Sequence, residues 1–153
     1  TYQVRVRVRD AAGNWSAVST KSIVVTAVTP PVVTPKLMVS TSSNRANAVP
    51  LQGANLDGTV YIYLDPGTLA GISQVEFTII WSKWLKLSTV DKKVPYDLAG
   101  TDNRGNANPV YTRLLPTGSY ELKATIRTAN GQKQTISSTF RIVRPSNNSV
   151  QQH

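Results

Sequence analysis

Few side chains of this 153-residue chain are suited to catalysis. The only histidine is His153, there is no cysteine, and there are eight carboxylates. Nucleophilic catalysis needs a base that the fold holds beside the nucleophile, which a terminal tail does not supply. A glycosidase needs two carboxylates about 5–9 Å apart across a cleft. Nearly all of the eight carboxylates are expected at turns or at outward-facing strand positions. The eight are Asp10, Asp57, Asp65, Glu76, Asp91, Asp97, Asp102 and Glu121. We therefore expect no catalytic activity.

One stretch concentrates oxygen atoms that could bind a metal. Asp102, Asn103 and Asn106 lie close together, and Asp97 shortly precedes them. Carboxylate and amide oxygens are ligands for Ca²⁺, so a loop calcium site is chemically reasonable, although the spacing is not that of a helix-loop-helix site. The same residue types also form ordinary long turns, and both interpretations stay open. No other cofactor is expected.

Aromatic residues suggest a binding surface. Tyr61 and Tyr63 alternate with aliphatic residues, so we expect them to form a surface stripe, which could stack on sugar rings or stabilise the sheet. Trp84 has the strand parity opposite to Trp81, which predicts a buried Trp81 and an exposed Trp84. Nearby cations would add contacts to acidic sugars. The predicted carbohydrate-binding residues are Tyr61, Tyr63, Lys83, Trp84, Lys86 and Arg104.

The net charge of +9 favours polyanionic partners. Arg5, Arg7 and Arg9 alternate along one segment and would form a line of guanidinium groups on one strand face. This line could bind an anionic glycan, lipopolysaccharide phosphates or nucleic acid, or it could be a charged face that protects an edge strand. The basic residues are scattered and no nucleic-acid-binding motif is present, so no sequence-specific nucleic-acid binding is expected.

The elements that would position these residues are β-hairpins, and one hairpin pattern occurs twice. Residues 1–25 align without a gap with residues 119–143. In both copies, apolar and polar residues alternate along a first strand, a turn follows at residues 10–14 or 129–131, and the same alternation continues along a second strand. Identical pairs are Tyr2/Tyr120, Arg9/Arg127, Ala11/Ala129, Gly13/Gly131, Ser19/Ser137 and Val25/Val143. We interpret this long period as one domain.

Residues 2–16 resemble the final two strands of bacterial fibronectin type III and related immunoglobulin-like modules. Residues 73–77, 94–102 and 115–125 resemble immunoglobulin-like accessory modules of secreted bacterial multidomain proteins. Such modules occur beside polysaccharide-degrading enzymes and in cell-surface adhesins. The resemblance implies an antiparallel β-sandwich of about seven strands and a secreted or cell-surface location. The connection between Asp65 and Ile72 is shorter than the family pattern.

The expected organisation has four parts. Residues 1–26 are the C-terminal hairpin of a preceding domain, residues 27–36 a proline-rich linker, residues 37–143 an immunoglobulin-like sandwich, and residues 144–153 a flexible tail. The chain is therefore expected to be part of a longer protein. Because a lone hairpin is marginal, we expect this one to pair against another sheet, from other domains of the same protein or by strand exchange with a second copy.

Together these features predict a non-catalytic accessory module that is polysaccharide-associated or carbohydrate-binding. The alternative is a structural spacer or adhesion repeat in a surface adhesin, with no ligand of its own. No apolar run approaches the ~20 residues that a membrane span requires, so no membrane span is expected.

Overall fold

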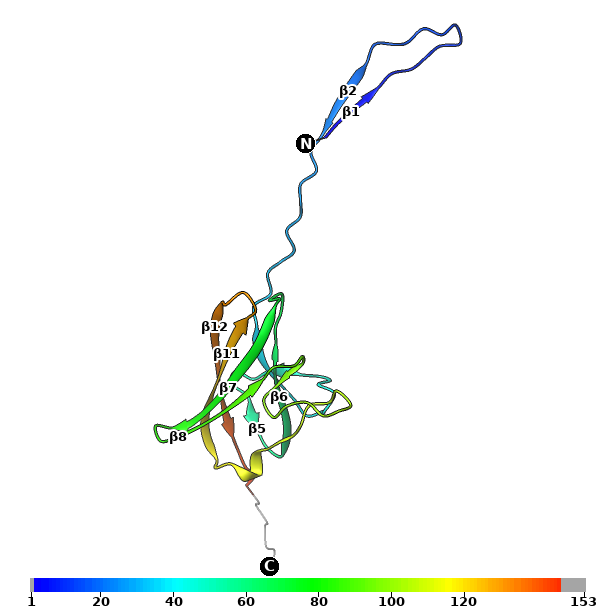
Figure 1. The fold of residues 1–153 in the computed structure, drawn as a ribbon. Coiled ribbons are helices and arrows are strands. Elements are labelled where there is room, and N and C mark those ends of the chain that lie inside the picture. Colours follow the sequence, from blue (N-terminus) through cyan, green and yellow to red (C-terminus); the bar gives the residue numbers. More distant parts are fainter. Residues whose placement is uncertain (1, 147–153) are drawn as a thin grey trace, which may run out of the picture. The chain divides into compact units, whose positions relative to one another are not determined.

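The computed structural model describes residues 2–146, and this part of the chain is an all-β protein (Figure 1). Its single helical element within those residues is the three-residue 3₁₀ turn η1 (Thr112–Leu114). The chain divides into two compact units, one ending at Pro31 and one beginning at Val32. Residues 24–35 have no regular secondary structure. Most of the predicted tail, residues 147–153, lies outside the described residues.

The first unit is the predicted β-hairpin. Strands β1 (Tyr2–Val6) and β2 (Ser19–Ile23) pair antiparallel. The turn forms at residues 10–14, where the Asp10 carboxylate accepts a hydrogen bond of 2.8 Å from the backbone N–H of Asn14. Gly13 has a φ of 91°, which a residue with a Cβ rarely adopts. The Asp-x-x-Gly-Asn pattern therefore forms the turn that the sequence predicts.

A β-bulge distinguishes this hairpin from its repeat. Near the turn, the backbone N–H of Ser16 donates to the carbonyl of Val8, whereas farther out Val6 pairs with Ser19. Two residues of the second strand, Ala17 and Val18, therefore lie opposite the single residue Arg7. In the second copy, the pairing runs without interruption from Gly118↔Ile142 to Arg127↔Lys133.

The apolar face of the hairpin is exposed in the part of the chain that the structure describes. Val4, Val6 and Val8 are 45%, 56% and 67% exposed. Strands β1 and β2 form a sheet of their own, without a third strand among the described residues. The equivalent face of the second copy is buried because it belongs to a complete sandwich. Pairing of the hairpin with a further domain or a second copy stays a prediction.

The second unit consists of two five-stranded sheets. One has the order β10-β6-β3-β4, with β9 also paired to β6, and the other has the order β5-β12-β11-β7-β8. The strands are β3 (Lys36–Ser40), β4 (Val49–Pro50), β5 (Asn55–Leu56), β6 (Thr59–Asp65), β7 (Ile72–Ser82), β8 (Leu85–Asp91), β9 (Tyr96–Asp97), β10 (Val110–Tyr111), β11 (Gly118–Thr128) and β12 (Lys133–Ile142). All pairs are antiparallel except β5 with β12.

The all-β sandwich confirms the predicted fold class, and the expected count of about seven strands is too low. Six strands have five residues or more, and four are two-residue strands that the alternation of longer segments does not reveal. β6 ends at Asp65 and β7 begins at Ile72, so a short loop connects the two sheets directly.

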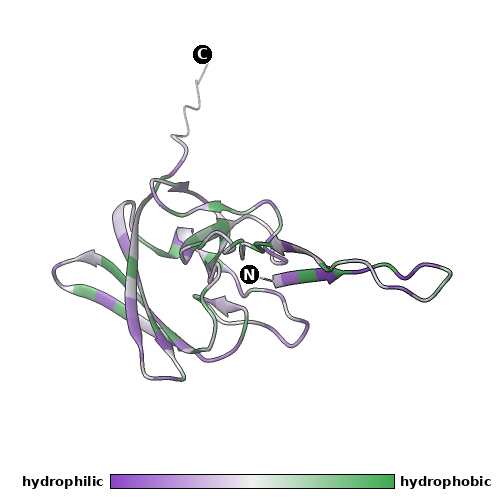
Figure 2. Cartoon of the chain, turned by 90° about the horizontal axis from the view of Figure 1, so that it is seen from above, coloured by the Kyte–Doolittle hydropathy of each residue, from purple (hydrophilic) through white to green (hydrophobic). Residues whose placement is uncertain are grey.

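The core lies between the sheets and follows the period-2 pattern of the strands. On β6, Val60, Ile62 and Leu64 are buried, and on β11 the buried residues begin at Tyr120 and continue at every second position. Hydrophobic and hydrophilic segments, green and purple in Figure 2, alternate along strands of the sandwich. Phe77 is fully buried at the centre of β7 and packs against the other residues of the hydrophobic core.

A stack of three aromatic rings closes one end of the core. The Tyr120 ring lies 5.4 Å from that of Phe140 and 6.3 Å from that of Trp81, measured between centroids. The Tyr120 hydroxyl donates to the carbonyl oxygen of Pro116 at 2.6 Å. The prediction that Trp81 is buried is wrong: it is 39% exposed. Its ring stacks on that of Tyr120, but it lies near the end of β7, where the other sheet does not fully cover it.

Tyrosine burial predicts loss of stability at alkaline pH. Burial raises the pKa of Tyr120 and of Tyr96 above the ordinary value of 10.0, so both are neutral in the folded protein when tyrosines of the unfolded chain begin to ionise. Their contribution is fully present below about pH 10 and is lost as the pH rises through the higher folded-state pKa values. Urea unfolding at several pH values should show this fall. The Tyr120→Phe variant should show a shallower one, and an unchanged slope would contradict the assignment.

Candidate functional site

A polar cluster on the outer side of β6 and β9 is built around Arg45, a residue that the sequence did not indicate. Arg45 lies in the loop after β3 with a φ of 64°, a conformation that non-glycine residues adopt only when their surroundings hold them there. Its backbone N–H donates to the carbonyl of Ser42 at 3.0 Å, and the Asn44 side chain accepts from Ala46. This tight turn directs the Arg45 side chain toward β9.

The guanidinium of Arg45 binds the carboxylate of Asp97 through two nitrogens. Nε donates to Oδ1 at 2.8 Å, and Nη2 donates to Oδ2. The Asp97 side chain is fully buried and that of Arg45 is 14% exposed. The Thr101 hydroxyl also donates to Asp97 Oδ2, and the hydrogen bond to Asp97 raises the pKa of Arg45. This carboxylate is therefore committed to a structural ion pair.

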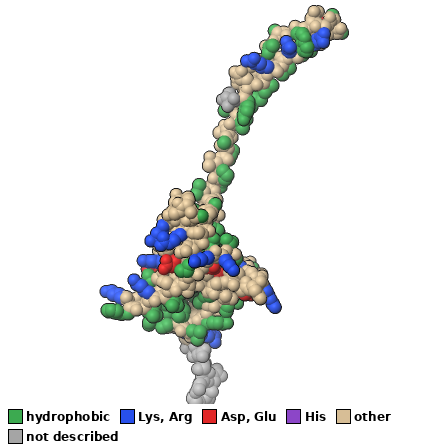
Figure 3. Space-filling model, viewed as in Figure 1, with side chains coloured by type: hydrophobic (Ala, Val, Ile, Leu, Met, Phe, Trp, Pro, Cys, Tyr) green, Lys and Arg blue, Asp and Glu red, His purple; other side chains and the backbone are tan. Residues whose placement is uncertain are grey.

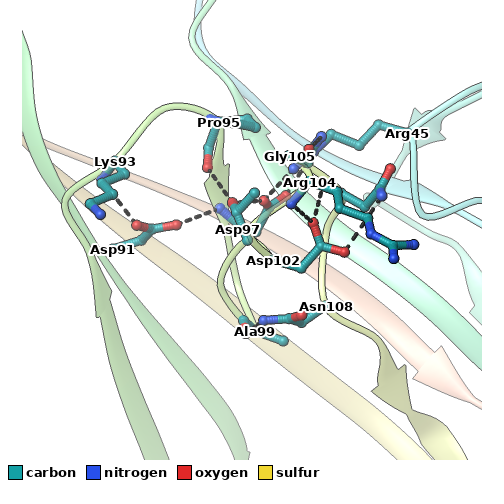
Figure 4. Close-up of polar contacts among 12 residues, drawn as sticks. Arg45, Asp91, Lys93, Pro95, Asp97, Ala99, Asp102, Arg104, Gly105 and Asn108 are labelled. Atoms are coloured by element: carbon teal, nitrogen blue, oxygen red, sulfur yellow. Dashed lines mark hydrogen bonds and ion pairs between the residues drawn. The ribbon is translucent and has the colours of Figure 1, made fainter.

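The neighbouring carboxylates hold turns. Asp102 accepts hydrogen bonds of 2.8 Å from the backbone N–H groups of Arg104 and Asn106, which lower the pKa of Asp102. Asp91 accepts bonds from the backbone N–H groups of Lys93 and Asp97. Figure 4 shows the three aspartates near one another, each with different partners. Their hydrogen bonds stabilise the loops of this region.

The predicted calcium ligands thus lie in one region, but the carboxylates of Asp97 and Asp102 already accept hydrogen bonds. Asp97 faces Arg45, and Asp102 faces the backbone of its own turn, which also contains Asn103 and Asn106. Within residues 2–146 no group of three His, Cys, Asp or Glu side chains is arranged to hold a metal ion. A Ca²⁺ ion here would need to displace these donors, and the calcium site stays a prediction.

Tyr61 and Tyr63 lie on the outer face of β6, as their alternation predicts. Both are half-buried, while Val60, Ile62 and Leu64 face the core. The Arg45 guanidinium lies over the Tyr63 ring at 6.0 Å from its centroid, and partial burial raises the pKa of Tyr63. Arg45 also donates to the carbonyl of Gly105 at 3.0 Å, which ties the loop carrying Arg104 to this face.

The other three predicted carbohydrate-binding residues belong to a different surface. Lys83 and Trp84 form the turn between β7 and β8, and Lys86 follows on β8, an edge strand of the other sheet. Trp84 is 93% exposed. The six residues therefore divide between two surfaces. We call the one with Tyr61, Tyr63 and Arg104 the β6 face, and the one around Trp84 the tip.

The arginines of the hairpin unit form a cation–aromatic cluster. The Arg7 guanidinium lies 4.3 Å from the centroid of the Trp15 ring and that of Arg9 lies 5.6 Å from it. Arg9 also donates through Nε to the carbonyl of Gly13 at 3.2 Å. Arg5 lies on β1 two residues before Arg7. No salt bridge involves these arginines within residues 2–146, so the face remains cationic.

No known protein family matches the chain by sequence, and no curated protein shows significant similarity to it. Among the described residues, the structure contains no helix of the length and apolarity that crossing a membrane requires. Arg45 could not have been selected from the sequence, because 52 positions separate it from Asp97. The only local signal is the series of Ser and Asn residues that marks its loop as a turn.

Proposed function

We propose that the chain is a non-catalytic, immunoglobulin-like accessory module that binds polysaccharide through the β6 face. The observation that carries the proposal is the pair Tyr61 and Tyr63, two residues apart on one outer strand face and bordered by the Arg45 loop. Flat aromatic side chains pack against the C–H faces of sugar rings, while polar groups at the rim fix orientation. Arg104 would supply charge for an acidic sugar.

The arrangement of strands supports the immunoglobulin-like part of this proposal. β6 pairs with β3 and with β10 in one sheet, while β7, β11 and β12 are neighbours in the other. The hydrogen bond from Tyr120 near the start of β11 to the carbonyl of Pro116 resembles the tyrosine corner of such sandwiches. Accessory modules of this architecture belong to secreted or cell-surface bacterial proteins, which is the location we propose.

The binding test uses pull-down and titration with cellulose, chitin, xylan, polygalacturonate and alginate. We expect at least one of these polysaccharides to bind the wild-type chain. Tyr61→Ala and Tyr63→Ala should each weaken that binding by about 1–3 kcal/mol, or about 5- to 150-fold, because stacking surface is lost. Tyr63→Phe keeps the ring and should bind nearly as well as the wild type.

Trp84→Ala is the matched control, since it removes an exposed aromatic ring from the tip. It should leave the affinity for the polysaccharide unchanged. A loss of affinity in Trp84→Ala with none in the tyrosine variants would place the sugar site at the tip and contradict the β6-face proposal. No binding of the wild type to any of the five polysaccharides would favour the alternative function.

That alternative is a structural spacer or adhesion repeat. The observation that favours it is the segment of residues 24–35, which contains three prolines, has no regular secondary structure and joins two compact β-units. Prolines restrict the backbone and make a linker semi-rigid. A spacer needs compact units joined by a semi-rigid linker, and it needs no ligand. Partners would then be neighbouring domains of the same protein or a second copy that covers the hairpin.

A further inference from the structure

The tip of the sandwich exposes large apolar side chains on two neighbouring turns. Trp84 is 93% exposed in the β7–β8 turn, and Leu114 is 80% exposed in η1. Leu85, Leu87 and Tyr111 are exposed to between 46% and 59%. Figure 3 shows hydrophobic side chains gathered at the end of the sandwich where β8 and η1 lie. An exposed group of large apolar side chains, unlike single apolar residues on a surface, can mark an interaction site.

A shallow groove lies between the strands of the β7–β8 hairpin and the η1 region. It has a volume of about 230 Å³, and its lining includes Ile79 and Leu87 from the β7–β8 hairpin and Tyr111 and Leu114 from the η1 region. Register explains why this surface is uncovered. Leu87 pairs with Ile79 on the core-facing side of β7 and β8, where Phe77 is buried, but Leu87 lies toward the end of the hairpin and is 59% exposed.

The η1 turn holds its leucine outward through several hydrogen bonds. The Thr112 hydroxyl and backbone N–H both donate to the carbonyl of Gly58, at 2.9 and 3.0 Å. Arg144 donates to the carbonyls of Thr112 and Leu115, at 2.9 Å each. Thr112 is 1% exposed while Leu114, two residues later, is 80% exposed. Display of this leucine is therefore a feature of an ordered turn.

Cations border the apolar tip, and its two turns contain no acidic residue. Lys83 and Lys86 flank Trp84, and Arg113 precedes Leu114, whereas residues 82–90 and 109–118 include no Asp or Glu. Lysine is depleted in protein–protein interfaces but suits a lipid surface, where its methylene chain packs on apolar groups and its ammonium reaches the headgroups. Tryptophan also favours the interfacial region of a bilayer.

We propose that the tip docks on the surface of an anionic phospholipid bilayer. Trp84, Leu85 and Leu114 enter the boundary between headgroups and acyl chains, and Lys83, Lys86 and Arg113 bind lipid phosphates. The exposed, protruding side chains do not enclose a small ligand, which a pocket normally buries by more than about 70%. This interaction is peripheral, and it is independent of the sugar-binding proposal for the β6 face.

The test is flotation of the intact chain with vesicles of phosphatidylcholine, with and without phosphatidylglycerol. We expect binding only to vesicles that contain phosphatidylglycerol, and weaker binding as salt is added. Trp84→Ser and Leu114→Ser keep the net charge, and each should reduce partitioning by about tenfold or more. Lys83→Gln and Lys86→Gln should each reduce it by about fivefold. All four positions are exposed or in turns, and thermal unfolding verifies that each variant is folded.

Matched controls separate this docking from general attraction of a basic protein to an anionic surface. Trp15→Ser and Val28→Ser remove exposed apolar side chains from the first unit and should leave binding unchanged. A variant with Trp84 as its only tryptophan, Trp15→Phe/Trp81→Phe, should show a blue shift of its fluorescence on vesicle binding. A variant that keeps only Trp15 should show none.

Three outcomes would overturn the proposal. The first is absence of binding to both kinds of vesicle. The second is equal binding to both, which would remove the role of the cations. The third is binding to phosphatidylglycerol vesicles that Trp84→Ser and Leu114→Ser do not weaken, because electrostatic attraction alone would then explain it.

Discussion

Replacing Arg45 with methionine is expected to lower the free energy of unfolding by about 3–5 kcal/mol, because it leaves the fully buried carboxylate of Asp97 without its ionic partner. The Thr101 hydroxyl would be the remaining side-chain donor to that carboxylate among the described contacts. Urea denaturation followed by tryptophan fluorescence measures the change. A second consequence is a looser loop at residues 101–107, since Arg45 also binds the carbonyl of Gly105.

A double variant distinguishes two causes of the loss of stability: the cost of leaving the Asp97 carboxylate unpaired, and the loss of a net favourable contribution of the ion pair. Arg45→Met/Asp97→Leu removes both charges, and replacement of a complete buried ion pair by apolar residues is often nearly neutral. We therefore expect the double variant to be more stable than Arg45→Met alone. If Arg45→Met costs less than about 1 kcal/mol, the carboxylate does not depend on its partner and the interpretation of this polar cluster is wrong.

Phe77→Ala should have an effect of similar size for a different reason. Phe77 is 0% exposed, and its neighbours across the sheet are Ala124 on β11 and Thr89 on β8. Small neighbours cannot fill the space that the ring leaves, so a cavity would remain. Removal of a buried aromatic ring lowers the free energy of unfolding by about 3–5 kcal/mol. Urea denaturation of the variant at neutral pH gives the value.

Trp81→Ala is the matched control on the same strand. Because Trp81 is 39% exposed and stacks on Tyr120 from one side, its removal should cost only about 1–2 kcal/mol. A cost equal to that of Phe77→Ala would show that the end of the sandwich is packed more tightly in solution than this exposure implies.

Alternation made the fold class predictable from the sequence. The buried positions of β6 and β11 and the turn at Asp10 are those that period-2 patterning and turn chemistry indicate. Trp81 differs from these positions. Its parity gives the side of the sheet on which it lies, but its exposure depends on how far cover extends toward the end of the sandwich, and no local pattern contains that information.

The surfaces were harder to predict than the strands. Tyr61 and Tyr63 face outward as predicted, because aliphatic neighbours take the core positions of the same strand. Their separation from Trp84 depends on the assignment of β6 and β7 to different sheets, which spacing along the chain does not define. The pairing of Arg45 with Asp97 and the exposure of Leu114 depend in the same way on distant loops.

The parallel pairing of β5 with β12 has a mechanical consequence. β12 is the last strand of the sandwich and β5 is the third, and Asn55 and Leu56 lie beside Arg141 and Ile142. Backbone bonds of 2.9 Å, from Arg141 to Ala54 and from Val143 to Leu56, join them. Tension that pulls the chain before β5 and the chain after β12 in opposite directions slides these two strands past each other. The bonds are then loaded together in shear, which a pair of strands resists better than peeling. A pull on the chain before β3 reaches this pair only through β3 and β4, which belong to the other sheet.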